Sequence, residues 1–170
     1  LIVNGSNFVE GSLIQFNATD RNTNFISGSQ LTAEISAADI ATAGSFPITV
    51  VNPAPGGGVS NAVSLSVNNP APSVTSIAPV NVLAGGPSIV LTVNGEGFIP
   101  ASTVRVNGND RVTTFINNLQ LTAQLTAEDI SVAGTAGITV FNAAPGGGAT
   151  TPANLTISNP QPALANIAPT

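Results

Sequence analysis

Cysteine, histidine, lysine, methionine, tryptophan and tyrosine are all absent from this chain of 170 residues. Their absence removes thiolate and imidazole ligands for metals, lysine Schiff bases and most side chains that act as general bases. No disulfide can form, so the fold has to be held together by packing. We therefore expect a protein that is not an enzyme, with no cofactor and no catalytic or metal-binding residue.

Charged side chains are scarce, at 6% of the residues where soluble globular proteins have about 25%. The net charge is −5, and the only positive side chains are Arg21, Arg105 and Arg111. We expect no nucleic acid as a partner, because nucleic acid requires a basic surface. No apolar run approaches the roughly 18 residues of a membrane span, so none is expected. The mean hydropathy of +0.35 argues against intrinsic disorder.

The chain repeats itself with a period of 90 residues. An offset of that length aligns Leu1 with Leu91 and Pro79 with Pro169 without a gap, and 37 of the 80 overlapping positions are identical. A period this long is typical of a whole small domain in tandem, since solenoid and propeller repeats have about 20–50 residues. The boundaries that it predicts are 1–69, 70–159 and 160–170.

Short runs of β-branched residues alternate with clusters of Gly, Pro and Asn in each repeat, which is typical of a β-sandwich. Side chains of Leu121, Ala123 and Leu125 share one face of a strand, and those of Ile138 and Val140 share a face of another, so we expect them in the core. The seven strands expected in the second repeat are 74–77, 89–93, 103–106, 112–115, 120–125, 136–141 and 153–157. The fold class is therefore all-β, with tandem antiparallel sandwiches.

Two short segments interrupt this pattern. Thr126 precedes acidic residues and a hydrophobic residue at 126–130, and 36–40 repeats the arrangement, which predicts one helical or 3₁₀ turn in each repeat.

Paired prolines follow in the linker 68–72 and again at 158–162. Because proline fixes φ, we expect an extended and fairly stiff connection between domains.

The glycine runs and the acidic residues are the remaining candidates for a site. We interpret Gly56, Gly57 and Gly58, like Gly146, Gly147 and Gly148, as turns between strands, because a phosphate cradle leads into a helix and has Lys or a fixed glycine spacing. Only Asp20 with Asp110 and Asp39 with Asp129 recur, whereas Glu10, Glu34 and Glu96 align with Pro100, Gln124 and Ser6.

These recurring acids are therefore not expected to form a catalytic pair, and the dense clusters that bind calcium are missing. For Asp20 with Arg21 and for Asp110 with Arg111 we expect a turn and an exposed ion pair. The N-glycosylation pattern occurs at Asn4, Asn17 and Asn154, but it is frequent by chance in a chain rich in Asn and Thr.

Three segments of the second repeat resemble the IPT/TIG family, the immunoglobulin-like domains of plexins, Rel-type transcription factors and bacterial surface proteins. They are PSVTSIAP at 72–79 with Gly85 and Gly86 following, VNGEGF at 93–98, and VRVNG at 104–108. The first repeat departs from the motifs with Asn7 at a glycine position and with Asn17 and Ala18 in place of Asn107 and Gly108. The resemblance implies an early-set sandwich, and for bacterial tandem copies a place on the cell surface or in an extracellular fibre.

The boundaries of the repeats do not coincide with the ends of the given sequence. The counterpart of 74–77 would lie before Leu1, and 160–170 matches 70–80, so the first strand of one unit is expected at the other end. The chain is then either a window of a longer polypeptide or the donor of a strand to a neighbouring copy. Both interpretations predict copies of itself, or adjoining repeats, as head-to-tail partners.

These features together predict a structural repeat unit of an extracellular bacterial fibre, stalk or surface array. One alternative is an adhesive or carbohydrate-binding module, which requires an exposed aromatic platform. The seven phenylalanines instead recur mostly at positions expected in the core, as Phe8 with Phe98 and Phe25 with Phe115. Another alternative is a non-catalytic spacer of a larger surface enzyme.

Overall fold

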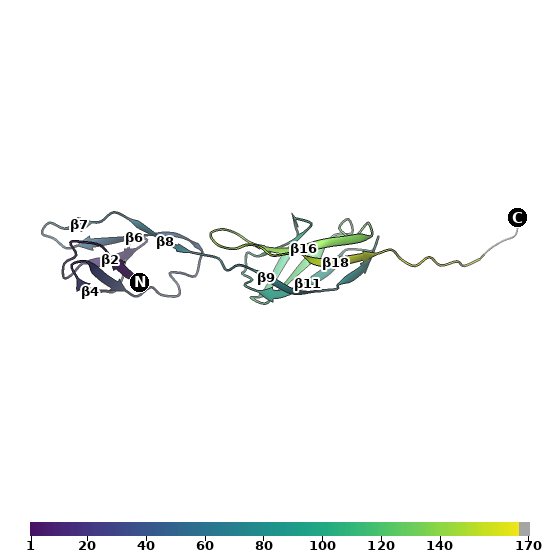
Figure 1. Cartoon of the computed structure of the whole chain (residues 1–170), viewed down its shortest axis with the longest axis horizontal. Helices are drawn as coiled ribbons and strands as arrows, with labels where there is room; N and C mark the ends of the chain where they lie inside the picture. The colour runs from purple at the N-terminus through teal and green to yellow at the C-terminus, as the bar shows by residue number, and fades with distance from the viewer. Residues whose placement is uncertain (167–170) are drawn as a thin grey trace. The chain divides into compact units, whose positions relative to one another are not determined.

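The computed structural model describes residues 1–166, and in this range its regular structure consists of strands (Figure 1). The chain divides into two compact units, Leu1–Asn68 (unit 1) and Asn69–Thr170 (unit 2). The boundary lies inside the predicted linker.

Unit 2 is a sandwich of two sheets, with β16 and β18 in one layer and β9 and β11 in the other (Figure 1). One sheet has the order β14 (Thr113–Asn117), β15 (Gln120–Leu125), β11 (Ile89–Glu96), β9 (Ser73–Ala78). The other has the order β10 (Asn81–Leu83), β18 (Ala153–Ser158), β16 (Gly134–Asn142), β12 (Thr103–Val106), β13 (Asn109–Asp110), and β17 (Gly148–Ala149) also pairs with β16.

All seven strands predicted for this unit are present, and two have the predicted bounds. The expected strand at 112–115 begins at Thr113 and continues to Asn117. Strands β10, β13 and β17 were not predicted, because runs of two or three residues show no alternation. One pairing also differs from the antiparallel expectation, since β10 runs parallel to β18.

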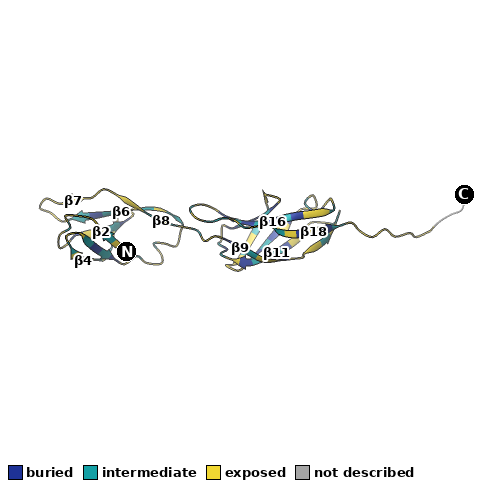
Figure 2. Cartoon of the chain, in the orientation of Figure 1, coloured by how far each residue is buried: buried dark blue, intermediate teal, exposed yellow. Residues whose placement is uncertain are grey.

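Alternating side chains of the two sheets build the core of unit 2 (Figure 2). The predicted core residues of β15 and β16 are all buried, at 2% exposure or less. The buried cluster is Ile77, Leu91, Val93, Phe98, Val104, Val106, Leu121, Ala123, Leu125, Ile130, Ala136, Ile138, Val140, Leu155 and Ile157.

Unit 1 repeats this plan with fewer strands. One sheet has the order β1 (Ile2–Asn4), β5 (Gln30–Ala33), β4 (Thr23–Ser27). The other has the order β3 (Thr19–Asp20), β2 (Leu13–Phe16), β6 (Gly44–Asn52), β7 (Gly58–Val59), and β8 (Val63–Val67) also pairs with β6. Its buried cluster is smaller and consists of Ile14, Phe16, Leu31, Ala33, Ile48 and Val50.

The segments predicted to form one helical or 3₁₀ turn are hydrogen-bonded turns, with bonds from residue i+3 back to residue i but no regular helix. In unit 2 the backbone N–H of Asp129 donates to the carbonyl of Thr126, and that of Ser131 donates to Glu128. The Thr126 N–H donates in return to the Asp129 carboxylate, at 2.8 Å. The two turns, 126–129 and 128–131, overlap but do not continue into a helix. The reciprocal bonds between Thr126 and Asp129 cap the first of them.

Residues 160–166 are exposed and have no regular structure. The strand predicted within 160–170 is thus not formed in this segment, and residues 167–170 lie outside the described residues. Its assignment as the first strand of a neighbouring domain stays a prediction.

Candidate interaction sites

The ion pairs of the structure join different residues from those that the sequence suggested. Arg21 does not pair with Asp20 but with Asp39, at 2.6 Å between Nη2 and Oδ1. Arg111 likewise pairs with Asp129, with Nε donating to Oδ2 at 2.7 Å. The predicted ion pairs between neighbouring residues were therefore wrong. Each arginine follows a short strand, β3 or β13, and its side chain reaches the loop that precedes β6 or β16, where the aspartate lies.

Asp110 instead pairs across the β12–β13 hairpin with Arg105, at 2.6 Å. This pair was not predicted, and it is the more exposed one: 64% of the Asp110 side chain is accessible, while the Asp129 side chain is 6% accessible. Asp20 accepts a hydrogen bond from the amide of Gln15 at 2.8 Å.

The aspartates of the two partly buried pairs have lowered pKa values. Hydrogen bonds from Arg111 hold the pKa of Asp129 below its ordinary value, and the same contact raises the pKa of Arg111. For Asp39 the hydroxyl and the backbone N–H of Ser36 lower the pKa most. Each aspartate therefore links an arginine to a turn, a structural role that leaves it ionised and fully occupied by donors. Among residues 1–166 no three acidic, His or Cys side chains group as metal ligands do.

The glycine runs form the turns that we predicted. All six glycines have positive φ, with values of 79°, 66° and 111° for Gly56, Gly57 and Gly58 and closely similar values in unit 2. A Cβ on Gly147 would lie 2.4 Å from the carbonyl oxygen of Asn142, so only glycine fits there. In both units the turn leads from a long strand into a short strand of two residues that pairs back on it.

The turn of unit 2 also binds the linker. Asn69 forms a parallel bridge with Gly146, in which its N–H donates to the Pro145 carbonyl at 2.8 Å and its carbonyl accepts from Gly147 at 2.9 Å. Its side-chain amide donates to the carbonyl of Ala143 at 2.8 Å. The next residue, Pro70, accepts a bond of 2.9 Å from the buried amide of Asn142. Residues 69 and 70 are therefore part of unit 2 and not free linker.

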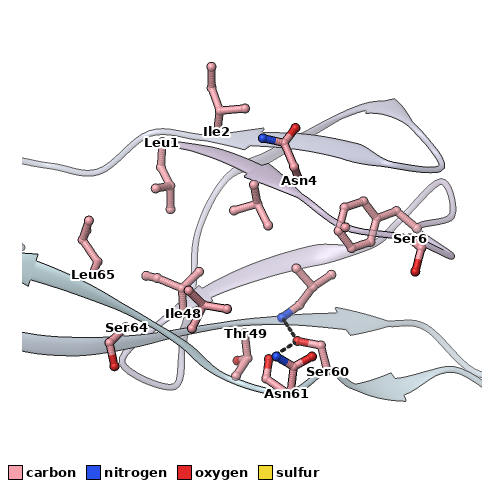
Figure 3. Close-up of a pocket in the computed structure, with 15 residues that line it drawn as sticks. Leu1, Ile2, Asn4, Ser6, Ile48, Thr49, Ser60, Asn61, Ser64 and Leu65 are labelled. Carbon is pink, nitrogen blue, oxygen red and sulfur yellow. Dashed lines mark hydrogen bonds between the residues drawn. The ribbon is translucent and has the colours of Figure 1, made fainter.

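Unit 1 has a groove between its two sheets, with a volume of about 370 Å³ (Figure 3). Strand β1 forms one wall, and β6 and β8 form the other. Leu1 points toward Ile48 across this space, whereas Ile2 points away from it (Figure 3). The lining residues are Leu1, Ile2, Val3, Asn4, Gly5, Ser6, Phe8, Ile48, Thr49, Val50, Ser60, Asn61, Val63, Ser64 and Leu65, and none of their side chains is charged.

The same positions are covered in unit 2. Leu91 and Leu155, the counterparts of Leu1 and Leu65, are fully buried, while Leu1 is 37% exposed. The cover comes from β9, which pairs with β11 and places Ile77 in the core and Val74 against it. In unit 1 the counterpart of β11 is β1, which lies at the edge of its sheet.

Aromatic side chains do not form a binding platform in the described residues. Phe98 is 2% exposed and Phe8 packs on the core of unit 1, as predicted. Phe115 packs on the core of unit 2. Phe25, expected in the core, is 41% exposed: it lies in an edge strand as Phe115 does, but beside the smaller buried cluster of unit 1.

The three asparagines of glycosylation patterns, Asn4, Asn17 and Asn154, are exposed. Among the described residues no helix is long and apolar enough to span a membrane.

The two-sheet topology, with β9, β11, β15 and β14 in one layer and β12, β16 and β18 in the other, defines an immunoglobulin-like β-sandwich. The family model described as "IPT/TIG domain" matches residues 72–158, which is just over half of the chain. The chain therefore belongs to the IPT/TIG family, whose domains are generally non-catalytic.

Solved structures similar to the chain include an amphioxus IgVJ-C2 molecule, with 15% identity and a TM-score of 0.44 over 92% of this chain and 96% of that one. The I9–I11 tandem of titin has 15% identity and a TM-score of 0.34 over 94% of this chain and 59% of that one. No curated protein matches the chain.

Proposed function

We propose that the chain is a structural repeat unit of an extracellular bacterial fibre, stalk or surface array in which domains follow one another head to tail. The observation that carries this proposal is the docking of the linker on the glycine turn. Asn69 and Pro70 are hydrogen-bonded into unit 2, so this repeat holds the end of the connection that precedes it. The residues Asn159 and Pro160 recur 90 positions later, so the same connection is available to a further repeat.

The surface supports an assembled state. A charge content of 6% leaves little electrostatic repulsion between neighbouring copies. The groove and the turns offer backbone hydrogen bonds and apolar contacts, which suit a permanent structural contact more than a soluble ligand.

Immunogold electron microscopy of the cells that make the protein tests this function. An antibody against unit 2 is expected to label extended surface structures at a regular spacing along their length. Labelling confined to the cytoplasm, or to dispersed single particles outside the cell, would contradict the proposal.

A further inference from the structure

We propose that strand β14 of unit 2 pairs antiparallel with β14 of a second copy, so that two chains join through one continuous sheet. This inference goes beyond the proposed head-to-tail function, because the contact lies at the edge of a sheet and not at the linker. The chemistry of the edge defines the partner: it is an uncharged strand whose residues complement one another when two copies meet about a two-fold axis.

Strand β14 is an edge with little protection against a further strand. It pairs with β15 on one side, and no other strand of residues 1–166 pairs with it. Edge strands are usually protected by shortness, charge, proline or a bulge. The five residues of β14, TTFIN, include no proline and no charge. A register shift between Phe115 and Asn117 is its one irregularity, and it leaves Thr113–Phe115 as regular strand.

The other edges of unit 2 have the protection that β14 lacks. Strand β9 lies between Pro72 and Pro79, and proline has no N–H to donate to a longer ladder. Strand β13 has two residues, of which Asp110 is charged, and Arg111 follows it. Strand β10 has three residues. Strand β14 is therefore the edge of this unit that can accept a further strand.

The backbone of β14 presents its free groups at regular positions. The N–H of Gln124 donates to the carbonyl of Val112 at 3.0 Å, so these two residues form a hydrogen-bonded pair of the ladder. Bonded and unbonded pairs alternate in an antiparallel sheet. Thr114 is therefore bonded to β15, whereas the N–H and carbonyl groups of Thr113 and Phe115 point to the open edge.

Side-chain contacts hold this edge in position. The hydroxyl of Thr113 accepts from the N–H of Val104 at 2.9 Å and donates to the carbonyl of Arg111 at 2.8 Å. Val104 belongs to β12 in the opposite sheet, so the edge strand is fixed to both layers. The side chain of Phe115 packs on the core. A strand that is already ordered loses little conformational freedom when it pairs.

The edge matches itself in an antiparallel pair centred on Thr114. In that register Thr113 lies opposite Phe115 of the second copy, and their outward backbone groups exchange hydrogen bonds on both sides of the axis. Val112 and Ile116 flank Thr114 at the same separation, so each lies opposite the other across the axis. They are 80% and 50% exposed, and the pairing buries both without desolvating an ion.

The equivalent edge of unit 1 provides a matched control. Strand β4 is also an edge strand with the same register shift. Asn22 and Asn24, however, occupy the positions of Val112 and Thr114. Asparagine is depleted in strands, and the apolar contact of Val112 with Ile116 has no counterpart in unit 1. The pairing is therefore specific to unit 2.

Charge exchange at Thr114 tests the pairing, in sedimentation velocity of the 170-residue chain over a range of concentrations. Thr114→Lys and Thr114→Glu are each expected to associate at least about tenfold more weakly than the unaltered chain, because like charges then face each other across the axis. An equimolar mixture of the two variants is expected to regain association, since opposite charges meet. Asn24→Lys and Asn24→Glu are expected to associate like the unaltered chain.

A disulfide tests the register. The chain has no cysteine, so Thr114→Cys can form a disulfide only between two copies. Residues of an unbonded antiparallel pair have Cα atoms about 4.5 Å apart, a separation that a disulfide can bridge. In mild oxidation Thr114→Cys is expected to dimerise at least about tenfold faster than Asn24→Cys, because the pairing holds the two thiols together. Non-reducing gel electrophoresis measures both rates.

The proposal is overturned if Thr114→Lys associates like the unaltered chain, or if the mixture of Lys and Glu variants associates as weakly as each variant alone. It is also overturned if the unaltered chain is a monomer at every concentration, or if the two cysteine variants dimerise at the same rate. None of these results bears on the head-to-tail array, which immunogold labelling of surface structures tests separately.

Discussion

The hydroxyl of Ser102 donates a hydrogen bond of 2.6 Å to Oδ1 of Asn142, and both side chains are buried in unit 2. The amide of the same asparagine donates to the carbonyls of Pro70 and Gly97. One side chain therefore joins the strand β16, the loop before β12 and the incoming linker. A buried amide with all these partners specifies one arrangement, because every alternative leaves polar groups unpaired.

Replacement of this amide gives the first prediction. Asn142→Ala leaves one hydroxyl and two carbonyls without their partner and is expected to lower the stability of unit 2 by at least about 3 kcal/mol. The equivalent Asn52→Ala in unit 1 is expected to cost less, because Asn52 is only half-buried and accepts from Ser12 and donates to Asn7. Urea unfolding of the two variants measures the difference, and equal losses would contradict this role of Asn142.

The two kinds of ion pair in unit 2 give the second prediction. Asp129→Asn removes the partner of Arg111 at a site where 6% of the aspartate side chain is accessible, and is expected to cost about 1–3 kcal/mol. Asp110→Asn alters an exposed pair with Arg105 and is expected to cost under about 1 kcal/mol. Thermal unfolding of both variants tests this order, which a larger loss for Asp110→Asn would reverse.

Acid stability provides a third test. Because the pKa values of Asp39 and Asp129 are lowered from the ordinary 3.8, folding gains stability from both residues above about pH 4. That stability is lost as the pH falls below 3.8 through the folded-state pKa values. The chain has no His, the side chain that normally titrates between about pH 5 and 8. Unfolding temperatures are therefore expected to be flat between pH 8 and 5 and to fall below about 4, and less steeply in the chain with both aspartates replaced by Asn.

Ala18 and Gly108 occupy equivalent positions of the two units and both have left-handed backbone. Exchanging alanine and glycine is therefore expected to change the stability of the two units in opposite directions. Ala18 has a φ of 62°, where unit 2 has Gly108 with a φ of 85° and open space around the position of a Cβ. An alanine in this region costs about 1 kcal/mol relative to glycine. Ala18→Gly is therefore expected to stabilise unit 1 by up to about 1 kcal/mol, and Gly108→Ala to destabilise unit 2 by a similar amount. Changes of the same sign in calorimetry would show that backbone strain does not decide the outcome.

The unequal cores of the two units give the last prediction. The buried cluster of unit 2 has 15 residues and that of unit 1 has 6, so unit 2 is expected to unfold at the higher temperature. In hydrogen exchange, the amides of β11 and β15 should then be protected longer than those of β1 and β5. Simultaneous exchange of the two sets would indicate that the units unfold together.

The core and the main strands were predictable because they depend on alternation over four or more residues. Leu121, Ala123 and Leu125 show this clearly, since the sequence pattern alone places them on one face of β15. The short β10 was missed, because its position depends on the carbonyls and N–H groups of β18 rather than on its own three side chains. The exposure of Phe25 was missed because the same sequence position, occupied by Phe115 in unit 2, packs there against a larger buried cluster than unit 1 has.

The interaction sites were less accessible to sequence reasoning. Adjacent Asp and Arg residues suggested local ion pairs, but the partners Arg111 and Asp129 are 18 residues apart and meet only after the sheet has formed. The linker prolines indicated a stiff connection, whereas the binding of Asn69 to the glycine turn depends on backbone groups that every residue has.

The parallel pairing of β10 with β18 has a mechanical consequence. These strands lie near the entry and the exit of unit 2, and they run in the same direction with Asn81 opposite Thr156 and Leu83 opposite Ser158. A force that pulls the two ends of the unit apart slides the strands along one another, so the bonds between them are loaded in shear and together. Further bonds from Ala84 to Ser158 and from Thr156 to Val80 share that load. Extension of unit 2 from its ends therefore requires these bonds to rupture together and not one after another.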